Sequence, residues 1–342
     1  MSQTITIALD AMSGDRGPAV AMDAAIEQLR AARNLKLIVV GDRAILEPMA
    51  ARAPAALKPR LGLHHASEVV AMDEPPQQAL RGKKDSSMRV AINLVKEGAA
   101  QACISAGNTG ALMATARFVL KTLPGIDRPA IISPIPAIDG HTLMLDLGAN
   151  TDCTPEQLFQ FGVMGSALAT AAYGLDRPRV GLLNVGSEEI KGNERVRQAA
   201  QLIGSSELNY IGFVEGNDIF SGRVDVIVSD GFVGNVALKT IEGMAKMIGA
   251  YIREEFTRTV FTKILAAVSM PVLRAVRRRL DPRRYNGASL LGLNGIVIKS
   301  HGGADRIAFA NAIRVAMLEV DKQVPTRITS LLEKQFAKEQ GE

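Results

Sequence analysis

Short, strongly apolar segments alternate with helical patterns along most of the chain, and this alternation constrains the fold more than any other feature. The apolar segments are rich in β-branched residues and end at small or polar residues, which is typical of buried strands. Such strands separated by helices predict an α/β fold with a mostly parallel sheet sandwiched by helices. The predicted strands are 4–9, 35–40, 102–105, 142–146, 180–185, 210–215, 225–229 and 295–299. The predicted helices are 17–32, 86–96, 109–121, 155–173, 194–203, 235–255 and 306–320.

Composition excludes several classes of protein. The 342 residues are 47% hydrophobic with a mean hydropathy of +0.11, so the chain can bury a large core. No apolar run reaches the ~18 residues that a membrane span needs, and residues 1–10 lead directly into a strand pattern, so we expect no signal peptide. Two cysteines make no disulfide framework and favour the reducing cytoplasm. Because the chain has no Trp to provide a stacking surface, we expect no nucleic-acid partner.

The segment 224–239, VDVIVSDGFVGNVALK, is the clearest candidate site. Its apolar run breaks at Asp230 and Gly231, a second glycine follows at Gly234, and Asn235 opens a helical pattern. This order predicts a buried strand, a glycine-bearing turn and the N-terminus of a helix. The free amide groups of a first helical turn favour an anion, so the segment predicts a phosphate site.

Four other predicted strands end in similar loops, all expected at one end of the sheet. Their hydroxyl and amide side chains either cap the next helix or bind an oxyanion, and both interpretations stay open. A lysine in such a loop either neutralises a phosphate or oxyanion or simply faces solvent. The candidates are Asp10, Gly14, Ser105, Gly107, Asn108, Thr109, Asp146, Asn150, Gly186, Glu188 and Lys191. In a further loop, IKSHGGADR, His301 is the one histidine well placed for a site.

Several common motifs are missing from the sequence. It contains no G-x-x-x-x-G-K-[ST], no G-x-G-x-x-G after a strand and no G-x-S-x-G. No cluster of His, Cys and Glu has the spacing of metal ligands. We therefore predict no metal, no cofactor, no nucleotide site and no serine-hydrolase elbow.

Residues 257–285 differ from the rest of the chain in composition. Apolar residues follow helical spacing, Pro271 interrupts the pattern, and Arg277–Arg279 form a basic flank. Between Arg253 and Arg284 lie nine Lys and Arg against three acidic residues. We predict an amphipathic helical hairpin here. It either packs within the protein or at a dimer contact, or docks a membrane surface or an acidic partner.

The motifs, read in order, resemble the bacterial phosphate acyltransferase that acts on acyl carrier protein. They are IALDAMSGDRGP, SAGNTGAL, LDLGAN, GLLNVGSEEIKGN, GNDIF, VDVIVSDGFVGNVALK and LLGLNGIVIKSHGGAD. The one small departure is Ser13, where the family usually shows a second glycine. The resemblance implies that a long-chain acyl group moves from the carrier-protein thioester to inorganic phosphate. It also implies an acyl phosphate product for phospholipid synthesis, a homodimer, and the fold of phosphotransacetylases and isocitrate/isopropylmalate dehydrogenases.

The residues suit this chemistry, because phosphate is itself a nucleophile and needs no covalent enzyme intermediate. We expect Lys191 to offset charge on phosphate or on the oxyanion, and Asn235 with the Gly231–Gly234 amides to donate hydrogen bonds to it. Asp230 is expected to orient Asn235 or a bound water. The expected lining of the phosphate cradle is Ser105, Asn108 and Thr109.

The expected architecture is one catalytic unit with two subdomains, about 1–105 plus 290–342 and about 106–289, with the hairpin at 257–285. The basic excess would attract the acidic carrier protein. The apolar face of the hairpin would contact the membrane, where a glycerol-3-phosphate acyltransferase consumes the product. Three alternatives stay open: a phosphotransacetylase using acyl-CoA, a decarboxylating dehydrogenase of the same fold, and a non-enzymatic phosphate- or acyl-binding regulator.

Overall fold

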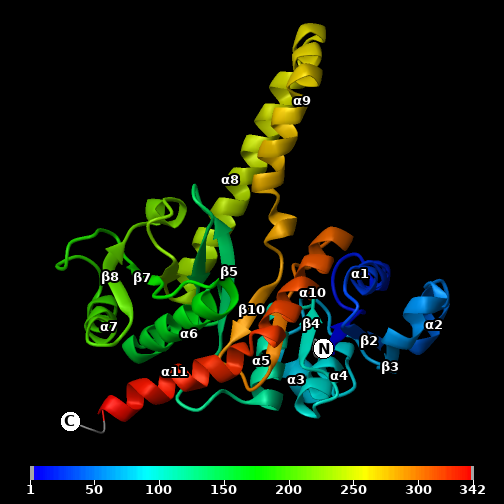
Figure 1. The fold of residues 1–342 in the computed structure, drawn as a ribbon, viewed down its shortest axis with the longest axis horizontal. Helices are drawn as coiled ribbons and strands as arrows, with labels where there is room; N and C mark the ends of the chain where they lie inside the picture. Colours follow the sequence, from blue (N-terminus) through cyan, green and yellow to red (C-terminus); the bar gives the residue numbers. More distant parts are fainter. Residues whose placement is uncertain (1–3, 340–342) are drawn as a thin grey trace.

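Eleven strands form one continuous sheet in the computed structural model, which describes residues 4–339 (Figure 1). The order across the sheet is β3-β2-β1-β4-β11-β10-β5-β6-β9-β7-β8. The strands are β1 (Ile5–Asp10), β2 (Leu35–Gly41), β3 (Leu61–His65), β4 (Ala102–Ser105), β5 (Ala130–Pro136), β6 (His141–Leu145), β7 (Arg179–Leu183), β8 (Asn209–Val214), β9 (Val226–Val228), β10 (Ala288–Leu291) and β11 (Ile296–Lys299).

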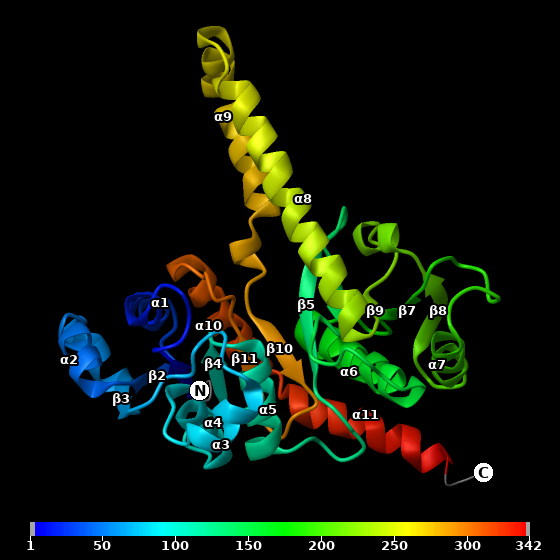
Figure 2. The same ribbon diagram turned by 180° about the vertical axis from the view of Figure 1, so that it is seen from behind.

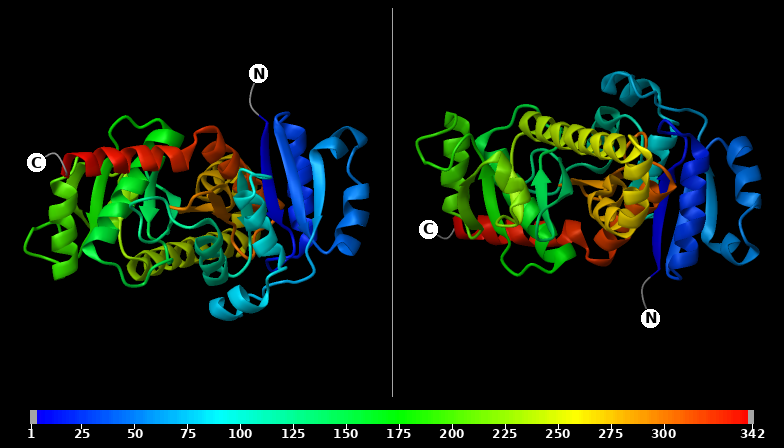
Figure 3. Two further views of the ribbon diagram at one scale, coloured as in Figure 1. Left: turned by 90° about the horizontal axis from the view of Figure 1, so that it is seen from below. Right: turned by 90° about the horizontal axis from the view of Figure 1, so that it is seen from above.

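Helices lie on both sides of the sheet, with α11 on one side and α8 on the other (Figure 3). The α-helices are α1 (Pro18–Ala31), α2 (Arg43–Ala51), α3 (Pro76–Gly82), α4 (Ser87–Lys96), α5 (Thr109–Leu120), α6 (Pro155–Tyr173), α7 (Glu194–Gly204), α8 (Gly231–Thr257), α9 (Val260–Leu280), α10 (Arg306–Asp321) and α11 (Val324–Glu339). The short 3-10 helices are η1 (Ala55–Arg60), η2 (Gly216–Phe220) and η3 (Pro282–Arg284).

The predicted fold class is confirmed, because seven of the ten strand pairings are parallel. All eight predicted strands are present within two residues of their expected ends. Their apolar side chains form the core, and Ile7, Leu9 and Val39 have no exposed surface. Burial of apolar area on both faces is what stabilises these short strands.

The expectation that all the candidate loops lie at one end of the sheet is wrong. Strand β10 is antiparallel to both of its neighbours, β11 and β5, and β6 is antiparallel to β5. Strands β6, β9, β7 and β8 therefore run opposite to β1, β2, β3, β4 and β11. As a result, the candidate loops leave the sheet in two opposite directions rather than at one shared end.

Helices α5 and α11 each pack on one half of the sheet. Helix α5 contacts α3 and α4, so it packs with the helices that cover the N-terminal strands. Ile328 of α11 belongs to the cluster of Leu158 of α6, so the C-terminal helix packs on the opposite half. Figure 3 shows α11 lying along the half that contains α6.

Helices α8 and α9 form an arm that projects from the sheet (Figures 1 and 2). The expected hairpin at 257–285 is wrong in its bounds, because Pro271 lies inside a single helix, α9, whose partner is α8. The turn is set by Thr259, which accepts a hydrogen bond from the Thr262 amide at 3.1 Å and so caps α9. Within residues 4–339, no helix combines the length and the apolar content needed to cross a membrane.

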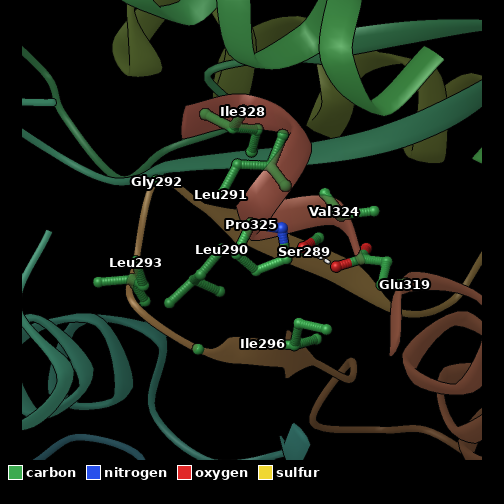
Figure 4. Close-up of a pocket in the computed structure, with 11 residues that line it drawn as sticks. Ser289, Leu290, Leu291, Gly292, Leu293, Ile296, Glu319, Val324, Pro325 and Ile328 are labelled. Atoms are coloured by element: carbon green, nitrogen blue, oxygen red, sulfur yellow. Dashed lines mark hydrogen bonds between the residues drawn. The ribbon is translucent and has the colours of Figure 1, made fainter. Parts of the chain in front are cut away.

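A buried carboxyl group lies where β10, α10 and α11 meet (Figure 4). Glu319 is 2% exposed and accepts a hydrogen bond of 2.9 Å from the Ser289 hydroxyl. A cavity of about 10 Å³ adjoins it, lined mainly by apolar residues such as Leu290 and Ile328. Burial raises the pKa of Glu319 to about 8, so the carboxyl group is held in its neutral form.

Glu319 should make the stability of the protein depend on pH. The ordinary pKa of this carboxyl is 4.5, so between about pH 4.5 and 8 the folded state holds a proton that the unfolded state releases. The free energy of unfolding should therefore fall as pH rises through this window. In Glu319→Gln the amide oxygen keeps the bond from Ser289 and this pH dependence should vanish.

Thermal unfolding of wild type and Glu319→Gln at about pH 5 and about pH 8 tests this prediction. Relative to wild type, the variant should gain stability at the higher pH. A difference between the two proteins that is the same at both pH values would contradict the argument.

Candidate active site

The loop after β6 is organised around Asp146, which has no exposed surface. Its carboxylate accepts hydrogen bonds from the amides of Ile131, Gly148, Ala149 and Asn150, at 2.6–3.2 Å, and from the Asn150 side chain at 2.9 Å. Burial raises the pKa of Asp146, and these hydrogen bonds oppose the shift. With all these partners inside the protein, Asp146 positions its loop and does not face a substrate.

Asn150 has the same kind of role. It is 4% exposed, and its side-chain amide donates to the Pro129 carbonyl at 2.8 Å as well as to Asp146. Its own carbonyl accepts from the Gly231 amide at 2.7 Å, which ties the loop to the start of α8. The expectation that Asp146 and Asn150 bind substrate is therefore corrected to a positioning role.

The glycines at the start of α8 allow the helix to pack against this loop. A Cβ atom on Gly234 would lie 1.9 Å from the Asp146 carbonyl oxygen, and one on Gly231 would lie 2.6 Å from the Asn150 carbonyl oxygen. Both positions are therefore closed to any larger residue.

The amides of this first helical turn are mostly occupied. The Gly231 amide donates to Asn150, the Val233 amide to the Asp230 carboxylate at 2.9 Å, and the Gly234 amide to the Asp230 carbonyl at 2.9 Å. Our expectation that the Gly231–Gly234 amides donate to phosphate is therefore wrong for three of the four. Asp230 is the helix cap, a structural role that fixes where α8 begins.

Asn235 is exposed at the start of α8 and lies against the glycine of the neighbouring loop. A Cβ atom on Gly148 would lie 3.3 Å from the Cβ of Asn235 and 3.5 Å from its Oδ1. Gly148 has a φ of +124°, a backbone conformation that favours glycine. Because its amide also donates a hydrogen bond to Asp146, the contact of Gly148 with Asn235 depends on the conformation of this loop. The Asn235 amide group is thus held near the strand ends and free to meet a ligand.

Lys191 lies across the backbone of the loop after β7. A Cβ on Gly186 would fall 2.5 Å from the Lys191 Cδ, so the glycine makes room for the lysine side chain. The ammonium pairs with Glu188 at 2.8 Å, which raises the pKa of Lys191 and lowers that of Glu188. Lys191 remains 47% exposed and charged, as its expected role requires.

The N-terminal strands carry a second buried carboxylate, Asp10, at the end of β1. It has no exposed surface and accepts hydrogen bonds from the hydroxyls of Ser13, Ser87 and Ser105. These bonds join β1, α4 and β4. The Ser105 hydroxyl also accepts from the Gly107 amide at 3.1 Å. Asp10 and Ser105 therefore hold the loops in place, which corrects the expectation that they contact substrate.

Most of the other N-terminal candidates also serve the structure. Asn108 caps α5 by accepting from the Ala111 amide at 3.0 Å, and its side-chain amide donates to the carbonyls of Met72 and Glu74. A Cβ on Gly107 would lie 2.6 Å from the Met88 Cε and 2.8 Å from the Ser13 hydroxyl, and the φ of +93° at Gly14 favours glycine there. Thr109, the first residue of α5, is exposed and its hydroxyl remains available to a ligand.

Lys299 is a site candidate that sequence reasoning missed. It is the last residue of β11, beside Ser105 of β4, and its side chain is only partly exposed. Burial lowers its pKa to about 8, and Lys239 of α8 adds to this shift while Asp15 and Asp10 oppose it. Lys299 is the last residue of the predicted strand 295–299, and this position at a strand end is the sequence signal that could have identified it as a site candidate.

His301 follows in the same loop and is exposed, as a site residue should be. Burial of part of its ring lowers its pKa, Glu242 of α8 opposes this, and Lys239, Lys299 and Lys246 add to it. Helix α8 therefore links the two sets of strand ends. It begins directly after β9, and Lys239, Glu242 and Lys246, one to three turns beyond Asn235, act on Lys299 or His301 at the end of β11.

Comparison with known proteins identifies the family. The family model described as "Fatty acid synthesis protein" matches residues 5–327. A protein named phosphate acyltransferase from Nitrosococcus oceani is 60% identical over 96% of this chain and 97% of its own length. A second, from Halorhodospira halophila, is 56% identical over the full length of both chains. The chain belongs to the phosphate acyltransferase family. It is an acyltransferase, as the resemblance of its motifs implied.

Solved structures agree with the fold. A phosphotransacetylase from Streptococcus pyogenes superposes with a TM-score of 0.61 at 16% identity, over 94% of both chains. One from Staphylococcus aureus gives 0.60 at 17% identity, also over 94% of both chains. The expected phosphotransacetylase-like architecture is confirmed.

Proposed function

We propose that the enzyme transfers a long-chain acyl group from an acyl carrier protein to inorganic phosphate, giving an acyl phosphate for phospholipid synthesis. The observation that carries this proposal is the identity of 56–60%, over nearly the whole chain, to proteins named phosphate acyltransferase. Their name specifies phosphate as the acceptor. The exposed polar groups at the start of α8 and in the loop after β7 suit that reaction.

The proposed reaction is a direct displacement. A phosphate oxygen attacks the thioester carbonyl carbon, a tetrahedral oxyanion forms, and the C–S bond then breaks to release the carrier thiolate, which takes up a proton. Lys191 places a positive charge near the oxyanion, and the Asn235 amide donates a hydrogen bond to it. Such donors contribute ~3–4 kcal/mol each. Holding phosphate beside the thioester contributes ~7–11 kcal/mol through orientation.

The proposal is tested by release of carrier thiol from a long-chain acyl carrier protein, with and without phosphate. Release should require phosphate, and the product should be an acyl phosphate. The second candidate is a phosphotransacetylase-type enzyme using acyl-CoA, favoured by the fold of the solved neighbours. Activity with acyl-CoA and none with acyl carrier protein would establish that candidate instead.

Docking of the acidic carrier protein is supported by charge on the arm. Arg274, Arg278 and Arg279 are exposed near the base of α9, whereas Arg283 is engaged by Asp281 and Asp305 at 2.7 and 3.1 Å. An exposed basic surface steers an acidic partner and makes its association sensitive to salt. We therefore include this surface, with the homodimer implied by the family, in the proposal.

The outer end of the arm is proposed to contact the cytoplasmic membrane surface. Phe261 and Ile264, in the first turns of α9, are 68% and 58% exposed. The variant Phe261→Asp/Ile264→Asp should reduce flotation with anionic vesicles about tenfold or more, because two apolar side chains no longer enter the lipid. These positions suit the test better than Leu273, which is partly buried.

The matched control for this prediction is Ile138→Asp, which alters a side chain that is 79% exposed in the turn between β5 and β6, outside α8 and α9. It should float like wild type. Undiminished flotation of the arm variant would remove the membrane interpretation and leave contact with a second copy, which size-exclusion chromatography of the same variant would detect.

A further inference from the structure

Lys299 is a partly buried cation without a counter-ion. Its ammonium group donates to the carbonyl oxygens of Ser300 and, at 3.5 Å, of Ala106, both of them neutral. It forms no ion pair with any residue in the part of the chain that the structure describes. A charge held away from water without a partner is costly unless an anion completes the site.

His301 adds a hydrogen-bond donor beside this cation. Its Nδ1 accepts a hydrogen bond of 3.0 Å from the Gly303 amide, and its own amide is fixed by Asn286 Oδ1 at 2.8 Å. An Nδ1 that accepts places the proton of the neutral ring on Nε2. The lowered pKa of His301 keeps the ring neutral at pH 7, so Nε2–H is available as a donor.

Helix α8 brings a second cation to the same place. Lys239 lies one turn beyond Asn235, on the same face of the helix, because residues four apart are neighbours on a helix surface. It pairs with Glu242 at 2.9 Å and remains 55% exposed. Its charge acts on both Lys299 and His301. The Asn235 donor and the Lys299 cation are therefore connected by a single turn of α8.

The charged groups around Lys299 and His301 come from α8, from the loop after β1 and from the end of β1. Lys239 and Lys246 face them from α8, with Glu242 between, and Asp15 faces them from the loop after β1. The Asp15 carboxylate lies against the backbone of Gly302, within 3.3–3.5 Å of a Cβ built there. Asp10, the remaining carboxylate, is already bonded by three serine hydroxyls.

We propose that Lys299, His301 and Lys239 bind the inorganic phosphate that acts as acyl acceptor, leaving Lys191 and Asn235 for the thioester carbonyl. The proposal rests on the proposed function and deepens it, since it divides one site between the two sets of strand ends. A phosphate group could also come from the phosphodiester of the carrier's prosthetic arm. The experiment below separates the two sources.

The test is calorimetric titration of the full-length protein with inorganic phosphate, without any acyl donor. Lys299→Met should weaken the Kd for phosphate at least about tenfold, the scale of one lost charge-assisted contact. Lys239→Met, at an exposed position that cannot disturb the core, should weaken it in the same direction. Lys58→Met, which alters an exposed lysine of η1, should leave the Kd unchanged.

The pH dependence gives a second readout. Because Lys299 has a pKa of about 8, wild-type affinity for phosphate should fall above about pH 8, and Lys299→Arg should retain affinity there because arginine stays charged. If Lys299 only stabilised the fold, wild type and Lys299→Arg would not differ in their phosphate affinity above about pH 8. Unchanged phosphate affinity in both Lys299→Met and Lys239→Met would overturn the proposal.

Kinetics separate the sources of the phosphate group. An increase in the KM for phosphate, with the KM for the acyl donor unchanged, is the expected result for Lys299→Met. An increase in the donor KM alone would assign the contact to the carrier's phosphodiester and overturn the proposal. A wild-type protein that binds phosphate yet transfers no acyl group would refute the proposed function while leaving this phosphate site standing.

Discussion

Replacing Lys191 with Met should reduce the rate of acyl-phosphate formation by about 10²–10³-fold, the usual cost of removing one donor to a developing oxyanion. The loop should stay folded, because Lys191 is half-exposed and its one ion pair, with Glu188, lies at the surface. The fall should be in kcat, since the interaction strengthens as the oxyanion forms. Asn235→Ala should act in the same direction, through loss of the second donor.

The measurement is the initial rate of acyl-phosphate formation at saturating phosphate and donor. Lys58→Met removes an exposed lysine that is far from Lys191 in the sequence, and its rate should equal that of wild type. If Lys191→Met and Asn235→Ala both retained wild-type rates while unfolding at the wild-type temperature, neither residue could hold its assigned role.

Adding a single methyl group at Gly234 should damage both stability and activity. The new Cβ would lie 1.9 Å from the Asp146 carbonyl oxygen and 2.9 Å from the Ser229 hydroxyl, so α8 would have to move away from the loop. Overpacking of this kind costs about 3 kcal/mol of unfolding free energy. Asn235, the next residue, would move with the helix, and a misplacement of about 1 Å lowers a rate about 10²-fold.

Gly243→Ala is the matched control, because it makes the same substitution in the same helix at a position where a Cβ meets nothing within 4 Å. It should be stabilising by about 0.5–1 kcal/mol, because alanine favours a helix. Equal unfolding temperatures for the two variants would show that α8 does not pack against the Asp146 loop as described.

Much of the fold follows from local pattern. The buried strands are found by their apolar β-branched runs, and the helix expected at 155–173 is α6, which Thr154 caps and Gly174 ends. Strands β3, β5 and β10 escaped notice for local reasons as well. β5 contains Pro134 and Pro136, and β3 pairs only with β2 at an edge of the sheet, where its apolar alternation is weak.

The relative direction of strands cannot be read from such patterns. The antiparallel placement of β10 depends on contacts between segments more than 150 residues apart, Ser289 with Ile132 for example. Because β10 is antiparallel to both neighbours, β5 runs in the same direction as β11, and the antiparallel pairing of β6 with β5 then reverses β6, β9, β7 and β8. The expectation that all candidate loops lie at one end of the sheet therefore could not be checked from local pattern, and it is wrong.

The candidate site shows the same limit at the level of single residues. Small and polar residues at strand ends predict a site, yet Asp10, Asp146 and Asn108 form hydrogen bonds with other groups of the protein. Only burial and hydrogen-bond partners separate such positioning residues from groups that meet a ligand. Lys299 was overlooked for the converse reason, because its partial burial and its nearness to α8 arise from tertiary packing.

Phosphate-dependent release of thiol from a long-chain acyl carrier protein, compared in wild type and Lys191→Met, tests the central claim most directly. The wild-type rate should saturate with phosphate and yield acyl phosphate, and Lys191→Met should lose about 10²-fold or more of that rate. A wild-type rate that does not depend on phosphate, or a Lys191→Met rate equal to wild type, would contradict the account.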